Sequence, residues 1–204
     1  EIFIAGRDIH EETAGTVFGE ALPLLREELR RKAKVINFSL IYGTSAFSLA
    51  KELGTTPREA QLFMDRYFAR HPGVSAYLEN IVREAEEKGF TETLFGRIRQ
   101  VPELQQKNHA VQQAGRRIAL NAPIQGSAAD LMKKAMIDIW RGLKSSGLGT
   151  KIILQVHDEL VFEVPPGEKR QVEELVRDRM ENVFPMRVPL KVHLGWGPNW
   201  GDAK

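Results

Sequence analysis

Hydrophobic residues recur at helical spacing along the first ninety residues of the chain. Residues 8–19 predict a short helix with Asp8 as its N-cap. Pro23 can start a second helix, which runs toward Tyr42 and stops at Gly43. Further helices are predicted over residues 45–53, from Thr56 to a break at residues 71–73, and over residues 75–88.

The middle of the chain alternates between short extended and long helical patterns. Residues 90–101 are β-prone around Gly96 and predict a small hairpin or loop. A helical stretch follows over residues 105–143, and Pro123 predicts two helices that meet there, because proline lacks a backbone donor and restricts the residue before it. Residues 142–150 contain three glycines and two serines and predict a loop.

The C-terminal part has strand character. Residues 151–164 are rich in Ile, Val, Leu and Phe, and the polar cluster His157-Asp158-Glu159 in their middle predicts the tip of a tight hairpin. Residues 168–184 predict an amphipathic helix, and residues 188–194 predict a final strand. The chain is therefore expected to be α+β, mostly helical, with an antiparallel sheet in its C-terminal part.

Composition narrows the class of protein. Of 204 residues, 42% are hydrophobic and 27% are charged, which is typical of a soluble globular protein. No apolar run is long enough to span a membrane, so no membrane partner is expected. The absence of cysteine excludes disulfides and allows a reducing compartment, and we expect the cytoplasm of a bacterium or of a viral host. The chain opens with Glu1 rather than Met, so we expect a fragment or a processed piece of a longer protein.

The formal charge is only +2, but basic residues gather in two segments. Residues 26–34 carry five bases against two acids, and residues 97–117 carry five bases against one acid. Local basic clusters in a nearly neutral protein suit a nucleic acid or a phosphate. The alternative is a solvated basic face without a ligand.

The basic helix that ends near residue 42 has a distinct arrangement of cations and rings. Arg26, Arg30 and Lys34 fall within about 80° of arc, each four residues from the last. Lys34 has no acidic residue three or four positions away, so a polyanion such as a triphosphate would relieve the repulsion between these cations. Phe38 and Tyr42 continue the ridge, where a ring could lie against a sugar or base. The alternative is an exposed basic helix with two aromatic residues packed inward.

Two further clusters are candidates for chemistry. An ionised carboxylate in the His157-Asp158-Glu159 tip is costly near an apolar sheet unless it is paired, and Mg²⁺ is a natural partner, although plain solvent exposure is the alternative. Arg117, Asn121 and Gln125 recur at intervals of four, so they could share a face despite Pro123, and guanidinium and amide groups can donate to acceptors in the minor groove of a nucleic acid. The alternative for this second cluster is a set of polar residues around a helix kink.

Several segments resemble the motifs of family A DNA polymerases, the bacterial DNA polymerase I type, and they follow in the family's order and at its spacings. The matching segments are Gly6-Arg7-Asp8-Ile9-His10, Arg30-Arg31-x-x-Lys34-x-x-x-Phe38-x-x-x-Tyr42-Gly43, Thr93-Leu94-Phe95-Gly96-Arg97-x-Arg99, Arg117-x-x-x-Asn121-x-Pro123-x-Gln125-Gly126-x-Ala128-Ala129-Asp130, and His157-Asp158-Glu159. Position 39 is Ser where many relatives have Gly, which we expect to be a minor change.

The resemblance implies a nucleotide-binding role for the basic helix. Arg30 and Lys34 would hold the triphosphate of the incoming nucleotide, and Lys34 could also protonate the leaving group. Phe38 would lie against the sugar and base, and Tyr42 would sit at the template position of the nascent pair. His10 would approach the triphosphate.

The resemblance also implies a metal ligand and DNA contacts. Asp158 would ligate Mg²⁺, His157 would lie near the primer terminus, and Glu159 would support the metal site. Arg97 and Arg99 would contact the DNA backbone, while the motif at residues 117–125 would contact the paired bases. Lys34, Asp158, Glu159 and His157 are thus the expected catalytic residues.

At the level of domains, the resemblance implies an incomplete right-hand polymerase fold. Residues 1–23 would form the junction of palm and fingers, residues 24–100 the fingers, and residues 101–204 the C-terminal part of the palm. The expected partners are primer–template DNA, a deoxynucleoside triphosphate, and an upstream polymerase segment. That upstream segment would supply the rest of the palm, the thumb and a second metal-binding Asp.

The expected function is template-directed DNA synthesis, in which two Mg²⁺ ions assist nucleotidyl transfer from a deoxynucleotide to a primer 3′-hydroxyl. One alternative is a non-catalytic nucleic-acid-binding module with a degenerate polymerase fold, although intact Lys34, Tyr42 and Asp158 argue against it. Another is a fragment of a single-subunit RNA polymerase, although residues 121–126 and 157–159 look more like the DNA enzymes. The residue that selects ribose or deoxyribose would lie upstream.

Overall fold

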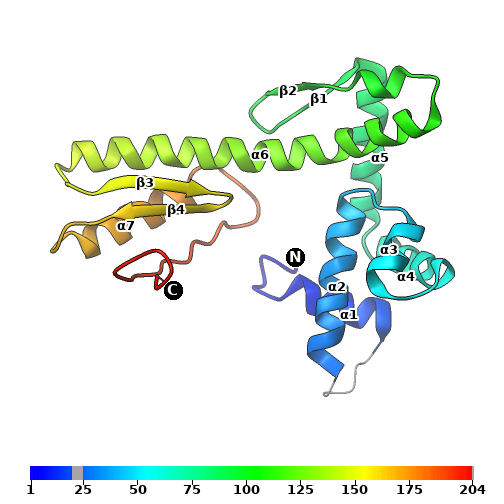
Figure 1. The fold of residues 1–204 in the computed structure, drawn as a ribbon, viewed down its shortest axis with the longest axis horizontal. Coiled ribbons are helices and arrows are strands. Elements are labelled where there is room, and N and C mark those ends of the chain that lie inside the picture. Colours follow the sequence, from blue (N-terminus) through cyan, green and yellow to red (C-terminus); the bar gives the residue numbers. More distant parts are fainter. Residues whose placement is uncertain (20–24, 204) are drawn as a thin grey trace. The chain divides into compact units, whose positions relative to one another are not determined.

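The computed structural model describes residues 1–19 and 25–203, which form two compact units, Glu1–Ser127 and Ala128–Lys204 (Figure 1). The first unit contains helices α1 (Ile9–Phe18), α2 (Arg26–Ile41), α3 (Ala46–Leu53), α4 (Pro57–Arg70) and α5 (Pro72–Lys88), the hairpin β1 (Phe90–Glu92) and β2 (Ile98–Gln100), and a 3₁₀ turn, η2 (Pro102–Gln105). Helix α6 (His109–Ser145) belongs to both units, and the second unit adds strands β3 (Lys151–Val156) and β4 (Glu159–Glu163) and helix α7 (Lys169–Glu181). The expected α+β class is confirmed.

Local capping explains where the first helices begin and end. The Asp8 side chain accepts the backbone N–H groups of the first turn of α1, as predicted. Thr56 and Glu59 form a capping box that starts α4. Gly54 and Gly89 end α3 and α5 in the left-handed conformation. The predicted start of α2 at Pro23 lies outside the described residues, and the described helix begins at Arg26.

Helix α5 begins earlier than the pattern predicted. We expected it to start at residue 75, but it starts at Pro72, directly after α4. Proline is well suited to the first helical position, because the backbone donor that it lacks would have no partner there. The break at residues 71–73 is therefore a change of helix rather than a loop.

The core of the first unit lies among α1, α2, α3 and α4. Its buried residues are Val17, Ile36, Leu40, Leu49, Ala50, Ala60 and Tyr67. A second buried cluster contains four residues: Ala85 of α5, Val101 just before the 3₁₀ turn, Leu104 within that turn, and Ala119 of α6. The contacts of the first cluster hold one face of α2 against the core, and its opposite face is exposed to solvent.

Helix α6 corrects two predictions. It runs without interruption through Pro123, so the two helices expected to meet there form one helix. A proline removes one backbone hydrogen bond, and packing on either side preserves the helix: Leu120 is buried before it and Ile139 after it. The helix also continues past Gly142, where we expected a loop, because that glycine packs closely on Leu175 of α7.

The second unit is a hairpin packed on two helices (Figure 1). Strands β3 and β4 pair antiparallel with Val156 opposite Glu159, which confirms the hairpin and its tip. Ile139 and Leu143 of α6 and Val172 and Val176 of α7 form the buried core, and side chains of both strands pack against it.

The C-terminal segment differs from the prediction in two places. Helix α7 ends at Glu181 rather than near residue 184, and residues 188–194 do not form a strand. In the described part of the chain, the backbone of this segment bonds to side chains instead: Val192 N–H donates to Glu181 at 3.0 Å, and its carbonyl accepts from Arg177 at 3.0 Å. None of the described helices is long and apolar enough to cross a membrane.

Candidate functional site

Helix α2 presents the predicted cationic and aromatic residues on the face opposite the core. Ala33, Ile36 and Leu40 are buried. Lys34 is exposed, and Phe38 retains 46% of its accessible surface. The spacing of four residues therefore produces the predicted ridge, with its cations toward the N-terminal half of the helix.

Carboxylates of α1 already neutralise part of this ridge. Both Asp8 contacts to Arg30 run through Oδ2, from Nε at 2.9 Å and from Nη2 at 2.6 Å. Arg26 pairs with Glu11 at 2.9 Å. The hydrogen bond from Arg30, followed by those from the backbone of α1, holds the pKa of Asp8 below its usual value. The sequence showed Asp8 only as a helix cap; its second role depends on α1 packing against α2.

Lys34 differs from these arginines. Among the described residues, its ammonium group has no ion pair or hydrogen bond with any side chain. Lys32, two positions earlier, pairs with Glu28 at 2.8 Å. Lys34 is therefore the cation of this ridge that is available to an external anion.

His10 lies beside the ridge and is half-buried, in a polar network whose other two members, Thr13 and Asn37, are buried. Its Nδ1 atom is 2.9 Å from the side-chain nitrogen of Asn37, whose oxygen accepts from the Thr13 hydroxyl at 3.0 Å. Burial lowers the pKa of His10 most strongly; Asp8 raises it, Arg30 and Lys34 lower it, and the net shift is downward. Sequence reasoning missed Asn37, which carries no signal at its position other than its polarity within a buried face.

An aromatic row continues along α2. The rings of His10 and Phe38 are 6.0 Å apart between centroids, and those of Phe38 and Tyr42 stack at 6.3 Å. Ser39, which faces the other way, is buried and its hydroxyl donates to Glu52 at 3.1 Å. The row offers flat apolar surfaces directly beyond the free ammonium group of Lys34.

Helix α6 meets the C-terminal end of α2 at Gly43. A Cβ at Gly43 would lie 2.7 Å from Leu120 and 3.9 Å from the Arg117 side chain, and the residue has a φ of +70°. Only glycine fits such an approach without strain. The fold thus brings Arg117 beside Tyr42 and Gly43, two motifs more than seventy positions apart in the sequence.

The polar residues of α6 share one face. Arg117, Asn121 and Gln125 advance by about 40° at each step of four in an uninterrupted helix, so the face expected from their spacing exists. Arg117 and Gln125 are exposed. The side-chain oxygen of Asn121 is buried without a hydrogen-bond partner among the described residues.

The β1–β2 hairpin docks on α6 next to this face. The backbone N–H of Leu94 donates to the buried Ser127 hydroxyl at 2.8 Å, and a Cβ at Gly126 would lie 2.6 Å from Thr93. Arg97 and Arg99 are exposed on the hairpin. Together with Arg117 they give the first unit a set of surface guanidinium groups.

In the second unit, a two-residue turn carries the acidic candidate. His157 and Asp158 connect β3 to β4, and His157 adopts a φ of +51°, which is unusual for a residue other than glycine. Gln155 donates to the His157 carbonyl at 2.8 Å and helps to fix the turn. His157, Asp158 and Glu159 are all exposed.

The turn fits part of a magnesium site. The Asp158 carboxylate is exposed and has no partner among the described residues, and Mg²⁺ commonly takes one or two carboxylates together with phosphate oxygens and water. Within the described residues, no group of three or more His, Asp or Glu side chains could hold a metal by itself. Further ligands would therefore have to come from a substrate or another segment.

The predicted site residues divide between the two units. His10, Arg30, Lys34, Phe38, Tyr42 and the DNA-contact candidates belong to the first, and the turn at residues 157–159 belongs to the second. Lys34 and Asp158 therefore belong to different units, and their approach to one another stays a prediction.

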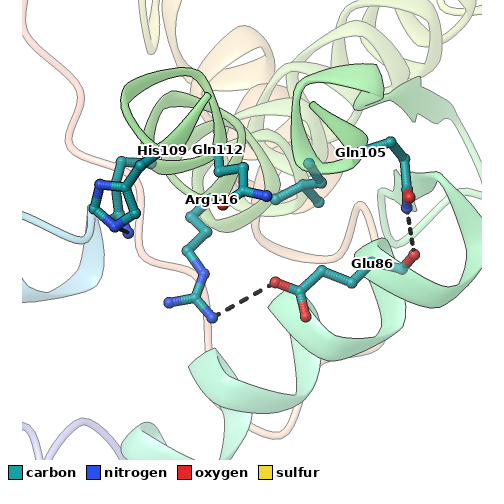
Figure 2. A pocket seen from close by; sticks show the side chains of 7 residues that line it. Glu86, Gln105, His109, Gln112 and Arg116 are labelled. Atoms are coloured by element: carbon teal, nitrogen blue, oxygen red, sulfur yellow. Dashed lines mark hydrogen bonds and ion pairs between the residues drawn. The ribbon is translucent and has the colours of Figure 1, made fainter. Parts of the chain in front are cut away.

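A separate polar pocket of about 450 Å³ lies between α5, the 3₁₀ turn and the start of α6 (Figure 2). Its lining residues are Glu86, Leu104, Gln105, His109, Gln112, Gln113 and Arg116. Figure 2 shows Arg116 reaching toward Glu86 at 3.5 Å and Gln105 donating to the Glu86 carbonyl at 2.8 Å. The formal charges of Glu86 and Arg116 cancel, and none of the predicted site residues lines this pocket.

Comparison with known proteins decides the family. The model of "DNA polymerase family A" matches residues 1–202, nearly the whole chain. The chain belongs to DNA polymerase family A. The resemblance inferred from the motifs is therefore confirmed.

Individual members of the family agree. The chain is 51% identical to DNA polymerase I of Pseudomonas aeruginosa over 96% of its own length, and 46% identical to the thermostable DNA polymerase I of Thermus filiformis over its full length. It spans only 22% and 24% of these relatives.

A solved structure is similar in fold as well. The polymerase domain of Pol1 from M. smegmatis, in a complex with DNA primer–template and dNTP, matches 99% of this chain with a TM-score of 0.94 and 45% identity. The chain covers 36% of that structure. The expected partial right-hand polymerase architecture is confirmed by this match.

Proposed function

We propose that the chain is part of a template-directed DNA polymerase and supplies its nucleotide-binding helix and one metal-site carboxylate. The observation that carries the proposal is the ridge on α2, where the exposed and unpaired Lys34 adjoins the rings of Phe38 and Tyr42. The relatives are named DNA polymerases, which favours this function over a single-subunit RNA polymerase.

The reaction would be nucleotidyl transfer. The oxygen of the primer 3′-hydroxyl attacks the α-phosphorus and loses its proton, the new phosphodiester bond forms as the bond between the α- and β-phosphates breaks, and pyrophosphate leaves. Arg30 and Lys34 would neutralise the charge that grows on the leaving group, and Lys34 could donate a proton to it. Arg30 would have to share its guanidinium between the triphosphate and Asp8.

The remaining residues would orient the substrates. Phe38 and Tyr42 offer stacking surfaces for the nucleotide and the template position. His10 lies beside Phe38 and close to Arg30 and Lys34, the residues proposed to bind the triphosphate. On the DNA side, the proposed contacts are Arg97, Arg99, Arg117, Asn121, Gln125 and His157.

Asp158, supported by Glu159, would hold Mg²⁺ together with oxygens from outside this chain. Bound Mg²⁺ would activate the attacking hydroxyl and stabilise the leaving oxygen. Because a second aspartate is expected from an upstream segment, we expect the 204 residues alone not to extend a primer.

Calorimetric titration of the chain with a deoxynucleoside triphosphate, Mg²⁺ and a matched primer–template tests the proposal. Lys34→Ala should weaken triphosphate binding by roughly tenfold or more, because it removes a charge-assisted contact, and should barely change DNA binding. Lys32→Ala is the matched control, since Lys32 already pairs with Glu28. Equal loss of DNA binding and triphosphate binding in Lys34→Ala would instead indicate a DNA-backbone contact in a non-catalytic module.

A further inference from the structure

A chain of hydrogen bonds through three residues, two of them buried, connects α1 to α2 beneath the proposed triphosphate site. Thr13 on α1 is fully buried, and Asn37 on α2 is 4% exposed. The Thr13 hydroxyl is 3.0 Å from the Asn37 oxygen, and the Asn37 nitrogen is 2.9 Å from His10 Nδ1. The network therefore ends at an imidazole that adjoins Arg30 and Lys34.

The hydroxyl of Thr13 determines which way the amide faces. A buried hydroxyl proton needs an acceptor, and within the described residues the Asn37 oxygen is the acceptor that Thr13 reaches. Turning the amide over would place its NH₂ group against the hydroxyl and leave the hydroxyl proton without a partner. The Asn37 nitrogen therefore faces His10.

The amide in turn determines the tautomer of His10. The Asn37 nitrogen only donates, so the Nδ1 atom must accept and cannot carry a proton. Burial lowers the pKa of His10 and so favours the neutral ring. In the neutral ring the single proton is on Nε2, because Nδ1 accepts from Asn37.

The tautomer decides how the ring meets an anion. Among the described residues, Nε2 has no hydrogen-bond partner, and the charges of Arg30 and Lys34 lie close enough to lower the pKa of the ring. With its proton on Nε2, the ring would offer a donor to phosphate oxygens. The other tautomer would present a lone pair to the same oxygens and repel them.

We propose that Asn37 and Thr13 are positioning residues that hold His10 in the Nε2–H tautomer, so that the imidazole donates to a bound triphosphate. This inference rests on the proposed function for its ligand, but the tautomer itself is a property of the chain without nucleotide.

Nitrogen NMR of the chain with labelled histidine tests the tautomer directly. The chain has five histidines, and His10→Gln identifies the signal of interest. The wild type should show a protonated Nε2 and an accepting Nδ1 without nucleotide. Thr13→Val keeps the shape of the side chain but frees the amide to turn, and should populate the Nδ1–H tautomer; Thr13→Ser retains the hydroxyl and should behave as the wild type. A protonated Nδ1 in the wild type would overturn the proposal.

Titration of the same variants with a deoxynucleoside triphosphate and Mg²⁺ tests the role. In Thr13→Val the Kd should rise in inverse proportion to the fraction of His10 that keeps the Nε2–H tautomer, about twofold when half of it changes. Asn37→Leu gives a second variant that removes the donor itself, and circular dichroism checks the fold of each. A changed tautomer with an unchanged Kd overturns the positioning role. If the wild type binds no triphosphate, both the proposed function and the positioning role of Thr13 and Asn37 are refuted. The tautomer of His10, which is measured without nucleotide, is not affected by that result.

Discussion

At the scale of single residues, the backbone of His157 makes the first prediction. A φ of +51° costs a residue with a Cβ about 1 kcal/mol, whereas glycine adopts it freely. His157→Gly should therefore be more stable than His157→Ala by about 1 kcal/mol, the reverse of the usual order in regular structure. Urea unfolding of both variants measures the difference, and a less stable glycine variant would show that the turn is not strained.

The ion pair of Asp8 with Arg30 leads to a second prediction at this scale, about how the stability of the fold depends on pH. The pKa of Asp8 is lower in the folded chain than the usual 3.8, so its charge stabilises the fold above that value, and this contribution is lost as pH falls through the folded pKa. Asp8→Asn keeps the cap on α1 but removes the pair with Arg30. At neutral pH it should lower the stability by a few tenths to about 1 kcal/mol, because the pair is partly exposed.

The pH series needs a control for the cap. Asp8→Ala loses the cap as well, and should cost about 1 kcal/mol more than Asp8→Asn at every pH. Thermal unfolding from neutral pH to about pH 3 should show the gap between wild type and Asp8→Asn closing, while the gap between the two variants persists. A constant difference between wild type and Asp8→Asn would mean that the charge of Asp8 does not stabilise the fold.

The same residues show what sequence could predict about the site. Periodicity placed Lys34 and Phe38 on one exposed face, because helical spacing alone determines which residues share a face. It could not place Asp8 on Arg30 or Asn37 on His10, since these contacts depend on how α1 packs against α2. Contacts between elements carry no period along the chain.

At the scale of elements, the predictions failed where packing overrides local preference. Pro123 predicted a break, but buried contacts on both sides preserve α6. Residues 188–194 have a β-prone sequence, but a strand forms only when its backbone can pair with another strand. Here the backbone of Val192 forms its hydrogen bonds with the side chains of Arg177 and Glu181 instead. The caps at Asp8 and Thr56, which depend on neighbouring residues only, were predicted, whereas the start of α5 at Pro72 was not.

Two glycines within helices offer a matched test of packing between elements. A Cβ at Gly115 of α6 would lie 2.9 Å from both the Glu103 Cβ and the Leu104 backbone nitrogen, so Gly115→Ala should cost about 1–3 kcal/mol. Gly15 of α1 has nothing within 4 Å, and Gly15→Ala should stabilise by about 0.5–1 kcal/mol. Urea unfolding compares them; a stabilising effect of Gly115→Ala, like that expected for Gly15→Ala, would mean that the 3₁₀ turn moves away from α6 without cost.

At the scale of the whole molecule, the proposal requires the two units to act on one nucleotide. The cationic ridge belongs to the first unit and the acidic turn to the second, and an Mg²⁺-bound triphosphate carries the charges that both would bind. The proposal therefore predicts that the two units are coupled. Removing a cation from the first unit should change how the acidic turn of the second unit responds when the nucleotide binds.

His157 provides the reporter for that coupling, because it adjoins Asp158 and is exposed. Addition of a deoxynucleoside triphosphate with Mg²⁺ should shift the ring signals of His157 in the wild type. Lys34→Ala should reduce the shift at equal ligand concentration, while Lys32→Ala, whose cation is paired within α2, should not. An equal shift of the His157 signals in the wild type and in Lys34→Ala would mean that the ridge and the turn bind separate ligands. That result would contradict the proposal that both act on one nucleotide.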